Sequence, residues 1–471
     1  MKSDRISLAC AAFCAFAAAW LFSPVLSHVF VNLEDYWLIV ANPHLRGLSF
    51  SELGWMFTSL DYGTYQPLGW LAYAVIYAWQ GLNPSAYHLG SWLTHAACAV
   101  LLYFVTVRIL AESPVKKTGT DGAVSLAGAI AVLVWAFHPM SVEPVAWATG
   151  LPDLLATMFF LAAVLAYLPP PGTSSRKEAP RGTLGVCLLL YLVSGLFRWK
   201  GVSLPVVLLA LDVVILRRDI RFGLLIEKLP FLAVAAAFGA VNAQSKLHLA
   251  PGHAVDAGLH TLAGPMFYLG KILVPVHLTV DYWIGRSPLQ AGGFVLLTGA
   301  LLWSRRARPA AAAWVCFAAA LLPSLVMSFH GRVVAHDRSV YLPALSLAVA
   351  LAGGLLALLR GGRLARAAAL SASAGVLAIF IVLSRAQMPV WADSESLWRH
   401  VLVEPMPPDY SHLNLANALF EQGRREEAAA ELSAQLRLFP GDRRAEGLAR
   451  ELRRPWGATS LDPRPALPYN H

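Results

Sequence analysis

The chain has 471 residues, of which 57% are hydrophobic and only 14% are charged. A soluble protein of this size carries about 25% charged residues. The charges are also unevenly placed: residues 386–471 hold 22 of them in 86 positions, about 26%, whereas residues 1–385 hold 43, about 11%. This composition excludes a soluble enzyme, a coiled coil and a disordered chain.

The low-charge region, 1–385, is predicted to be an all-α, multi-pass membrane domain. A span needs roughly 20 apolar residues, because the bilayer core is about 30 Å thick and a helix rises about 1.5 Å per residue. Outer-membrane barrels would instead show short strands of alternating polarity. The stretches that lack Asp, Glu, Lys and Arg are 6–33, 62–107, 123–142, 154–175, 182–197, 201–211, 229–245, 257–270, 287–304, 309–331, 339–359 and 367–384.

Basic residues predict the orientation, since cytoplasmic loops are rich in Lys and Arg. Consecutive cytoplasmic clusters must enclose an even number of spans, but three apolar stretches lie between Lys228 and Arg305. The middle one, near 257–276, is interpreted as interfacial or re-entrant. This leaves about 11 transmembrane helices in a bacterial inner membrane, with the N-terminus cytoplasmic and the C-terminal domain periplasmic or extracellular. The clusters assigned to the cytoplasm are Lys2/Arg5, Arg108/Lys116/Lys117, Arg176/Lys177/Arg181, Arg217/Arg218/Arg221/Lys228, Arg305/Arg306/Arg308 and Arg360/Arg363/Arg366.

The first outer segment, 28–87, is too long for a simple connector. It carries the acidic pair Glu34-Asp35 just beyond the first span. A carboxylate at the membrane face can deprotonate an acceptor hydroxyl, so the pair is a candidate for catalysis. The alternative interpretation is an ordinary pair of solvated loop residues.

The third outer loop, Arg198-Trp199-Lys200, lies between two short apolar stretches, 182–197 and 201–216. Each is roughly 24 Å long as a helix, which is less than the hydrocarbon thickness. Arg198 and Lys200 are therefore expected at or below headgroup depth, where a cation needs a partner or a water-filled cavity. The cations either snorkel to ordinary headgroups or bind the phosphate of a lipid-linked substrate. Arg332 and Arg338 of the fifth outer loop are further candidates for phosphate binding.

Other polar residues of the outer loops are candidates for lining a substrate cavity. No metal is predicted, because the histidines match no zinc pattern such as His-Glu-x-x-His and the five cysteines lack ligand spacing. No nucleic-acid partner is predicted either. The cavity candidates are Tyr65, Gln66, His138, Glu143, Asp153, His336 and Asp337.

The C-terminal region, 386–454, is predicted to be a short helical repeat domain followed by a Pro-rich tail, 455–471. Residues 409–442 span 34 positions, with Gly423 ending a first helix and Pro440 ending a second. This length and order match a tetratricopeptide repeat. Since about three repeats are normally needed for independent stability, the domain is expected to dock on the membrane domain or on a partner.

In their shared order, several segments over about residues 30–442 resemble the transmembrane-and-tetratricopeptide-repeat (TMTC) family, glycosyltransferases of the GT-C type. No single segment carries the resemblance alone. The segments are EDYWLIVANPHLRGLSF, WMFTSLDYGTYQPLGWLAY, GLNPSAYHLGSWLTHAACAVLLY, HPMSVEPVAWATGLPDLLA, KGVSLP (200–205), EKLP (227–230), DRSVYLP (337–343) and WADSESLWRHVL.

The resemblance implies a GT-C fold, a polyprenyl- or dolichyl-phosphate sugar donor and a catalytic acid in the first outer loop. Eukaryotic members transfer mannose to Ser or Thr of secretory proteins. The family usually has Asp-Asp where this chain has Glu34-Asp35, and many bacterial relatives have Trp-His-Pro where it has Tyr65-Gln66-Pro67. These departures leave open which carboxylate is catalytic and whether activity is retained.

The leading hypothesis is an inverting membrane glycosyltransferase with a lipid-phosphate sugar as donor and a hydroxyl, on protein Ser or Thr, as acceptor. Its expected partners are membrane lipid, the donor, and an acceptor or partner protein held by the repeat domain. One alternative is a non-catalytic scaffold that uses the repeat domain to bind a partner protein. A transporter is disfavoured, because the halves of the membrane domain show no internal repeat.

Overall fold

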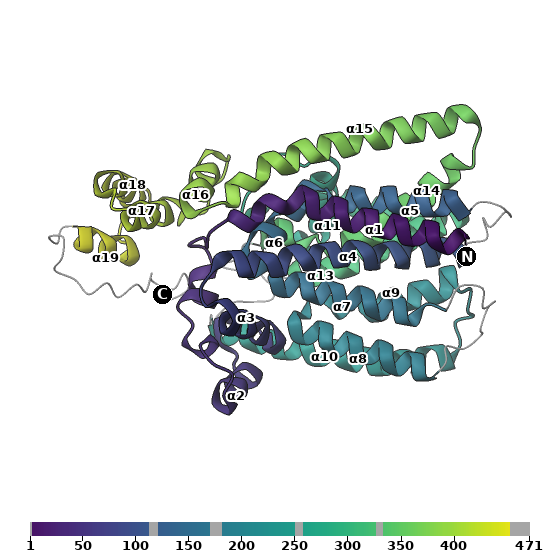
Figure 1. Ribbon diagram of the computed structural model, residues 1–471, viewed down its shortest axis with the longest axis horizontal. Coiled ribbons are helices and arrows are strands. Elements are labelled where there is room, and N and C mark those ends of the chain that lie inside the picture. The colour runs from purple at the N-terminus through teal and green to yellow at the C-terminus, as the bar shows by residue number, and fades with distance from the viewer. Residues whose placement is uncertain (1, 113–120, 170–180, 250–257, 326–332, 453–471) are drawn as a thin grey trace.

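The computed structural model describes residues 2–112, 121–169, 181–249, 258–325 and 333–452, and the structural statements that follow concern these residues. It is a bundle of long helices that run side by side along the long axis (Figure 1). Helices α16–α19 stand at the end opposite the start of α1 (Figure 1). We call that end of the bundle the distal end.

Six segments of the described chain are long and apolar enough to cross a bilayer, judged by length and composition. Four of them include a short 3-10 turn beside the helix, namely η1 (Ser23–Ser27), η6 (Ala148–Gly150), η9 (Arg305–Ala307) and η11 (Met388–Trp391). The helices of these segments are α1 (Lys2–Phe22), α4 (Pro84–Glu112), α7 (Leu151–Tyr167), α10 (Phe222–Leu249), α13 (Arg308–Leu325) and α15 (Arg363–Gln387).

The remaining predicted spans are shorter or broken. Helix α5 (Asp121–Ala136) is followed by η5 (Pro139–Ser141) and α6 (Val142–Ala146), with a bend of 61° at the break. The stretch 201–216 holds the end of η7 (Trp199–Ser203), then α9 (Leu204–Ala210) and η8 (Leu211–Ile215), and the last two together reach roughly 18 Å. A helix thus lies at each of the eleven predicted positions, and how many of them cross the membrane stays a prediction. The shorter apolar helices are α8 (Arg181–Phe197), α12 (Pro288–Trp303) and α14 (Ala344–Leu359).

Short elements connect the long helices. The stretch predicted to be interfacial or re-entrant holds α11 (Leu259–Leu273), followed by β1 (Tyr282–Ile284). This strand pairs antiparallel with β2 (Val333–Ala335), and Tyr282 lies opposite Ala335. The other connecting elements are η1 (Ser23–Ser27), η2 (Tyr36–Val40), η3 (Pro43–Leu45), α2 (Phe50–Thr58), η4 (Asp61–Gly63), α3 (Pro67–Gln80), η7 (Trp199–Ser203) and η10 (Asp337–Ser339).

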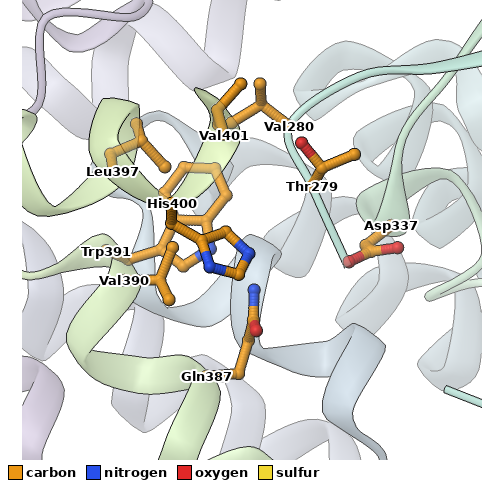
Figure 2. A pocket seen from close by; sticks show the side chains of 9 residues that line it. All are labelled: Thr279, Val280, Asp337, Gln387, Val390, Trp391, Leu397, His400 and Val401. Atoms are coloured by element: carbon orange, nitrogen blue, oxygen red, sulfur yellow. The ribbon is translucent and has the colours of Figure 1, made fainter. Parts of the chain in front are cut away.

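The C-terminal region forms a helical hairpin flanked by two further helices. The hairpin occupies the segment in which the repeat was predicted, and Gly423 between its helices has φ 79°, a conformation that glycine adopts at little cost. The core inside this region is small, whereas Leu397, Trp398 and Val401 pack into the main core of the membrane bundle. A small pocket lies along the seam between the two parts (Figure 2). The helices are α16 (Ser394–Val403), α17 (Ser411–Glu421), α18 (Arg425–Leu438) and α19 (Arg443–Leu452).

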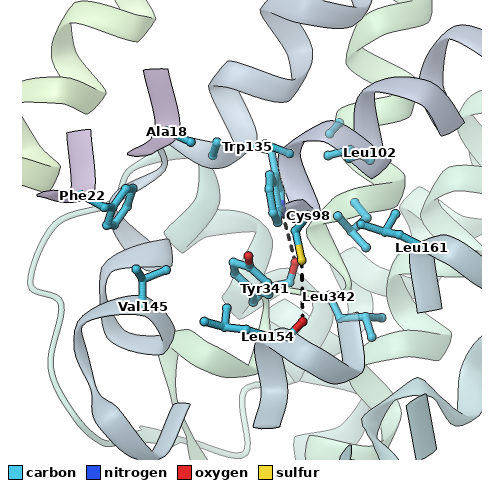
Figure 3. Packing of buried hydrophobic residues seen from close by; sticks show 14 of the residues in the cluster. Ala18, Phe22, Cys98, Leu102, Trp135, Val145, Leu154, Leu161, Tyr341 and Leu342 are labelled. Atoms are coloured by element: carbon cyan, nitrogen blue, oxygen red, sulfur yellow. Dashed lines mark hydrogen bonds between the residues drawn. The ribbon is translucent and has the colours of Figure 1, made fainter. Parts of the chain in front are cut away.

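The main core is packed between α1, α4, α5 and α7, together with the chain that leads into α14 (Figure 3). Tyr341 is central to it. The indole Nε1 of Trp135 donates to the Tyr341 carbonyl (3.1 Å), and the Tyr341 hydroxyl lies 2.7 Å from Nδ1 of His95. Because buried polar groups are costly unless paired, these bonds fix how the segment after η10 sits on the bundle.

Buried charges join α7, η8 and α10. Asp212 is fully buried; its carboxylate accepts the Tyr167 hydroxyl and lies 3.0 Å from Arg218 and 2.7 Å from Lys228. Arg218 also binds Glu227 at 2.7 Å. Two cations thus face two carboxylates, so the network is electrically balanced.

Replacing Lys228 by Met should destabilise the fold, because Asp212 would keep a buried charge with one cation in place of two. We expect a loss of about 3 kcal/mol, read as a lower midpoint of thermal unfolding in detergent. The matched control is Arg221→Met, which breaks an ion pair with both side chains more than 75% exposed; such pairs contribute little. Equal midpoints for the two variants would show that the network does not hold the fold.

Candidate active site

Asp35 is fully buried and ties the first outer segment to the start of α7. Its Oδ2 accepts from the backbone N–H of Val31 at 3.0 Å. Its Oδ1 accepts from the backbone N–H (3.0 Å) and the hydroxyl (2.9 Å) of Thr149. Burial raises the pKa of the Asp35 carboxyl to about 7, although these three donors act in the opposite direction. Each oxygen accepts at least one of these hydrogen bonds, so the carboxylate holds the loop in place. The catalytic role predicted for Asp35 stays a prediction.

Glu34 has the opposite surroundings. Its side chain is 34% exposed, and its carboxylate lies 3.9 Å from the guanidinium of Arg338. Arg338 itself binds the buried carboxylate of Glu143 through its side chain and its backbone N–H (3.0 Å). Its guanidinium also stacks over the Trp147 ring, 4.6 Å from the ring centroid. Arg338 is therefore held firmly on one side while Glu34 stays open to solvent on the other.

The two cations of the third outer loop converge on one carboxylate. Asp153 Oδ1 lies 3.3 Å from Arg198 Nε and 3.0 Å from Lys200 Nζ. The Arg198 guanidinium also donates to Thr64 (3.2 Å) and to Gln66. Lys200 remains 21% exposed. Two positive charges share one negative charge, so this group carries a net charge of +1 and can attract an anion.

One short segment, 147–153, contacts all three groups. Trp147 packs on Arg338, Thr149 binds Asp35, and Asp153 binds Arg198. The turn within the segment needs a glycine, because a Cβ on Gly150 would lie 2.3 Å from the carbonyl oxygen of Pro144. The segment is thus a rigid link between the acidic pair and the cations.

Tyr73 of α3 lies among the same groups. Its hydroxyl donates to the Thr149 carbonyl at 3.1 Å. Burial raises the pKa of this hydroxyl well above its usual value, with the positive charge of Arg198 opposing and the negative charge of Asp35 adding to the shift. Through Thr149, Tyr73 therefore packs against the segment that contacts both the acidic pair and the cations.

Two of the residues predicted to line the substrate cavity, His138 and Tyr65, bind groups outside the site. His138 is turned into the bundle, where its ring accepts from the Met140 N–H and lies 2.9 Å from the Ile272 carbonyl. The Tyr65 hydroxyl donates to the Phe57 carbonyl and so faces α2. Arg332 lies outside the described residues.

His336 and Asp337 precede Arg338 but bind elsewhere. His336 Nε2 lies 3.0 Å from Asp281, and Asp337 accepts the hydroxyl of Tyr282 at 2.8 Å. Burial raises the pKa of Asp337 well above its usual value, and the nearby Glu143 adds to the shift. These two residues support the loop that carries Arg338.

Four uncharged residues at the site were missed as site residues. Thr64, Trp147 and Thr149 each contact a predicted charged residue, and Tyr73 binds Thr149. Trp147 and Thr149 lie within the segment HPMSVEPVAWATGLPDLLA, which carried part of the resemblance, so their position was the available signal.

The chain is similar in sequence to curated protein O-mannosyl-transferases. Human TMTC1 (Homo sapiens) is 23% identical in an alignment 508 residues long, and the alignment covers 91% of this chain and 55% of that protein. Human TMTC3 is 33% identical over 109 residues, covering 23% and 10% respectively. TMTC2 of Mus musculus is 28% identical over 192 residues, covering 41% and 20%. The chain is TMTC-like. The resemblance predicted from the sequence is confirmed, and the chain spans between about a tenth and about half of these relatives' lengths.

Two further comparisons add less. No family model matches the chain. One solved structure, titled ArnT from Cupriavidus metallidurans bound to undecaprenyl phosphate, is 16% identical and covers 94% of this chain and 72% of that one, with a TM-score of 0.43. A score of this size does not establish a shared fold.

The stability of the protein should depend on pH through Asp35. The folded chain binds this proton more tightly than an exposed Asp with a pKa of 3.8 does, so stability is lost as pH rises from about 4 through 7. Between pH 5 and pH 8 we expect roughly 2–3 kcal/mol of loss in the wild type that is absent in Asp35→Asn. Thermal unfolding at both pH values measures it, with the exposed Asp219→Asn as control. If the wild type instead became more stable relative to Asp35→Asn on going from pH 5 to pH 8, the three hydrogen bonds would outweigh the effect of burial on the Asp35 pKa.

Proposed function

We propose that the chain is an inverting membrane glycosyltransferase of the GT-C type. It transfers a sugar, mannose by analogy with the names of its relatives, from a polyprenyl-phosphate donor to a Ser or Thr hydroxyl on the outer face of the membrane. The observation that carries the proposal is the exposed Glu34 beside Arg338, linked through segment 147–153 to the net-positive group of Asp153, Arg198 and Lys200. A base and an anion site are thus held on one frame.

The donor phosphate is assigned to Arg198 and Lys200. The net charge of +1 in this group favours a phosphate, and a guanidinium can bind phosphate oxygens through parallel N–H groups. Lys200 is partly exposed, so its ammonium is accessible to a headgroup. The short helices on either side support a position of both cations at the depth of a lipid phosphate.

The acceptor hydroxyl is assigned to Glu34. The carboxylate takes the hydroxyl proton while the hydroxyl oxygen attacks the anomeric carbon from the face opposite the phosphate. The bond between the anomeric carbon and the phosphate oxygen breaks, and its electron pair leaves with the lipid phosphate. Fixed cations can stabilise that charge without a general acid. Asp35 holds the loop through Val31 and Thr149 and does not itself take the proton.

The rest of the chain follows from this assignment. We place about eleven spans in a bacterial inner membrane, with the N-terminus cytoplasmic. The distal end, with helices α16–α19, then faces the periplasm. These helices act as a short tetratricopeptide-like unit that presents the acceptor protein to Glu34.

Replacing Lys200 by Met should weaken the binding of undecaprenyl phosphate. The variant leaves one cation against Asp153, so the net charge that attracts the phosphate is lost. A charge-assisted hydrogen bond contributes about 1.5–3 kcal/mol, and we expect roughly 10- to 100-fold weaker binding. Thermal-shift titration of the purified chain with undecaprenyl phosphate measures it. The control is Arg437→Met, which removes an equal charge from an exposed position on α18. Equal affinities in all three proteins would remove Lys200 from the donor site.

Replacing Glu34 by Gln should abolish most transfer, because the amide cannot accept the proton. Loss of a general base lowers kcat by about 10²- to 10⁴-fold. The assay follows labelled mannose from undecaprenyl-phosphate mannose to a synthetic peptide that contains Ser and Thr.

Thr149→Val provides the comparison, since it removes one of the three hydrogen bonds to Asp35 and leaves Glu34 intact. We expect this variant to lose less than about tenfold in kcat, because one hydrogen bond contributes about 1 kcal/mol. Full activity in Glu34→Gln would contradict the assignment of the base to Glu34, and full activity in Asp35→Asn would contradict the role of Asp35 in holding the loop. No transfer of mannose by the wild type would contradict the sugar assignment.

A further inference from the structure

We propose that Asn32 is a positioning residue through which the docked helices α16 and α17 hold the acidic pair in its working position. This inference rests on the proposed function in assigning the base to Glu34. It goes further in giving α16 and α17 a role in the chemistry in addition to presenting an acceptor. The argument depends on where the hydrogen bonds of Asn32 lead.

Asn32 uses its backbone N–H and both ends of its side-chain amide to bind the C-terminal helices. Its backbone N–H donates to the hydroxyl of Ser394 at 2.9 Å. Its Nδ2 donates to the carbonyl of Asn414 at 2.9 Å, and its Oδ1 accepts from the indole of Trp398 at 2.6 Å. These partners lie 362 to 382 residues further along the chain. The side-chain amide of Asn32 therefore binds α16 and α17 at the same time.

Asn32 is adjacent in sequence to Val31, which binds Asp35. Val31, its neighbour, donates its backbone N–H to Asp35 Oδ2. Val29 extends the contact, because its N–H donates to the Ala392 carbonyl at 3.0 Å. Residues 29–32 therefore lie between the C-terminal helices on one side and the buried carboxylate on the other. A shift of these residues would move Asp35, and with it Glu34.

A second contact reaches the opposite side of the site. The Tyr410 hydroxyl at the start of α17 donates to Asp281, and Asp281 binds His336 at 3.0 Å. His336 lies two residues before Arg338, the cation nearest to Glu34. Tyr410 also packs edge-on against Trp398, with ring centroids 5.7 Å apart. The same pair of helices thus contacts both the acidic loop and the loop of its cationic neighbour.

The pocket at the seam between these helices and the bundle is lined by both polar and apolar side chains. Figure 2 shows Thr279 and Asp337 on one side of the pocket and Gln387 and His400 on the other. His400 of α16 contacts the carbonyl of Leu278 across the seam at 2.8 Å, and Gln387 at the end of α15 contacts the same carbonyl from within the bundle at 3.4 Å. Docking therefore relies on specific hydrogen bonds as well as on apolar packing, and single polar changes should be able to loosen it.

The first experiment measures hydrogen–deuterium exchange of residues 29–40 in the full chain, with no substrate present. Asn32→Ala and Trp398→Phe each remove the hydrogen bond between the Trp398 indole and Asn32 Oδ1, one by changing the acceptor and the other by changing the donor. Trp398→Phe keeps an aromatic ring in the core. We expect at least tenfold faster exchange over 29–40 in either variant, and no further gain in the double variant. The control is Arg399→Ala on the exposed surface of α16, where Arg399 pairs with Glu395 within the helix. Unchanged exchange in Trp398→Phe would overturn the coupling.

The second experiment separates positioning from binding. In the mannose transfer assay with a short Ser- and Thr-containing peptide, Asn32→Ala and Trp398→Phe should lower kcat at least tenfold. The Kd for undecaprenyl phosphate should stay within twofold, because Arg198 and Lys200 do not contact Asn32. A loss confined to KM for the peptide would instead assign the helices to acceptor binding alone and overturn the positioning role. If the wild type transfers no mannose, the proposed function fails in that assay, and the exchange experiment still decides the coupling.

Discussion

The arrangement of the site depends on the burial of one carboxylate. Asp35 has no exposed surface, and an ionised group without partners would be very costly there. The N–H of Val31 and both donors of Thr149 offset part of that cost. The carboxylate therefore fixes the first outer segment against the start of α7. Because Asp35 is fixed, the side chain of the preceding residue, Glu34, is directed toward solvent and Arg338.

Buried charges serve two different purposes in this molecule. Around Asp212, two cations face two carboxylates and the charges cancel, so the network can act as a structural clamp between helices. At the distal end, Asp153 is shared by Arg198 and Lys200, and one positive charge is left over. A buried cation without full compensation is costly in an apolar setting. Retaining an excess charge is reasonable where an anionic ligand supplies the missing partner.

The sequence predicted the composition-dependent features well. Long charge-free stretches become helices because membrane spans must satisfy their own backbone hydrogen bonds. The shortness of the stretches beside Arg198 and Lys200 predicted that these cations need a partner, and both bind Asp153 with low exposure; their depth in the membrane stays a prediction. Asp153 was among the candidate residues, but its pairing with Arg198, 45 residues away, depends on how α7 and α8 pack.

Other features could not be predicted from one sequence. Choosing between Glu34 and Asp35 requires knowing which is buried, and that depends on Thr149, 114 residues further along. Asn32 has no charge and belongs to no motif, so nothing in its local pattern suggests a role. Its partners on α16 and α17 are brought to it only by the docking of the C-terminal region. Long-range hydrogen bonds of uncharged residues are set by tertiary structure and leave no periodic signal.

The small size of the C-terminal region explains why its docking and the geometry of the site should be coupled. The core inside α17–α19 contains five buried apolar side chains, too few to stabilise a separate domain. Its stability therefore comes in part from Trp398 and its neighbours, which are buried in the membrane bundle. If docking favours the bonded arrangement of residues 29–35, that arrangement must favour docking to the same extent, because coupling free energies are reciprocal. Any protein bound to α16–α19 that prefers the docked state would then also stabilise the loop that carries Glu34. Under the proposed function, an acceptor held by these helices would in this way help to assemble the site that modifies it.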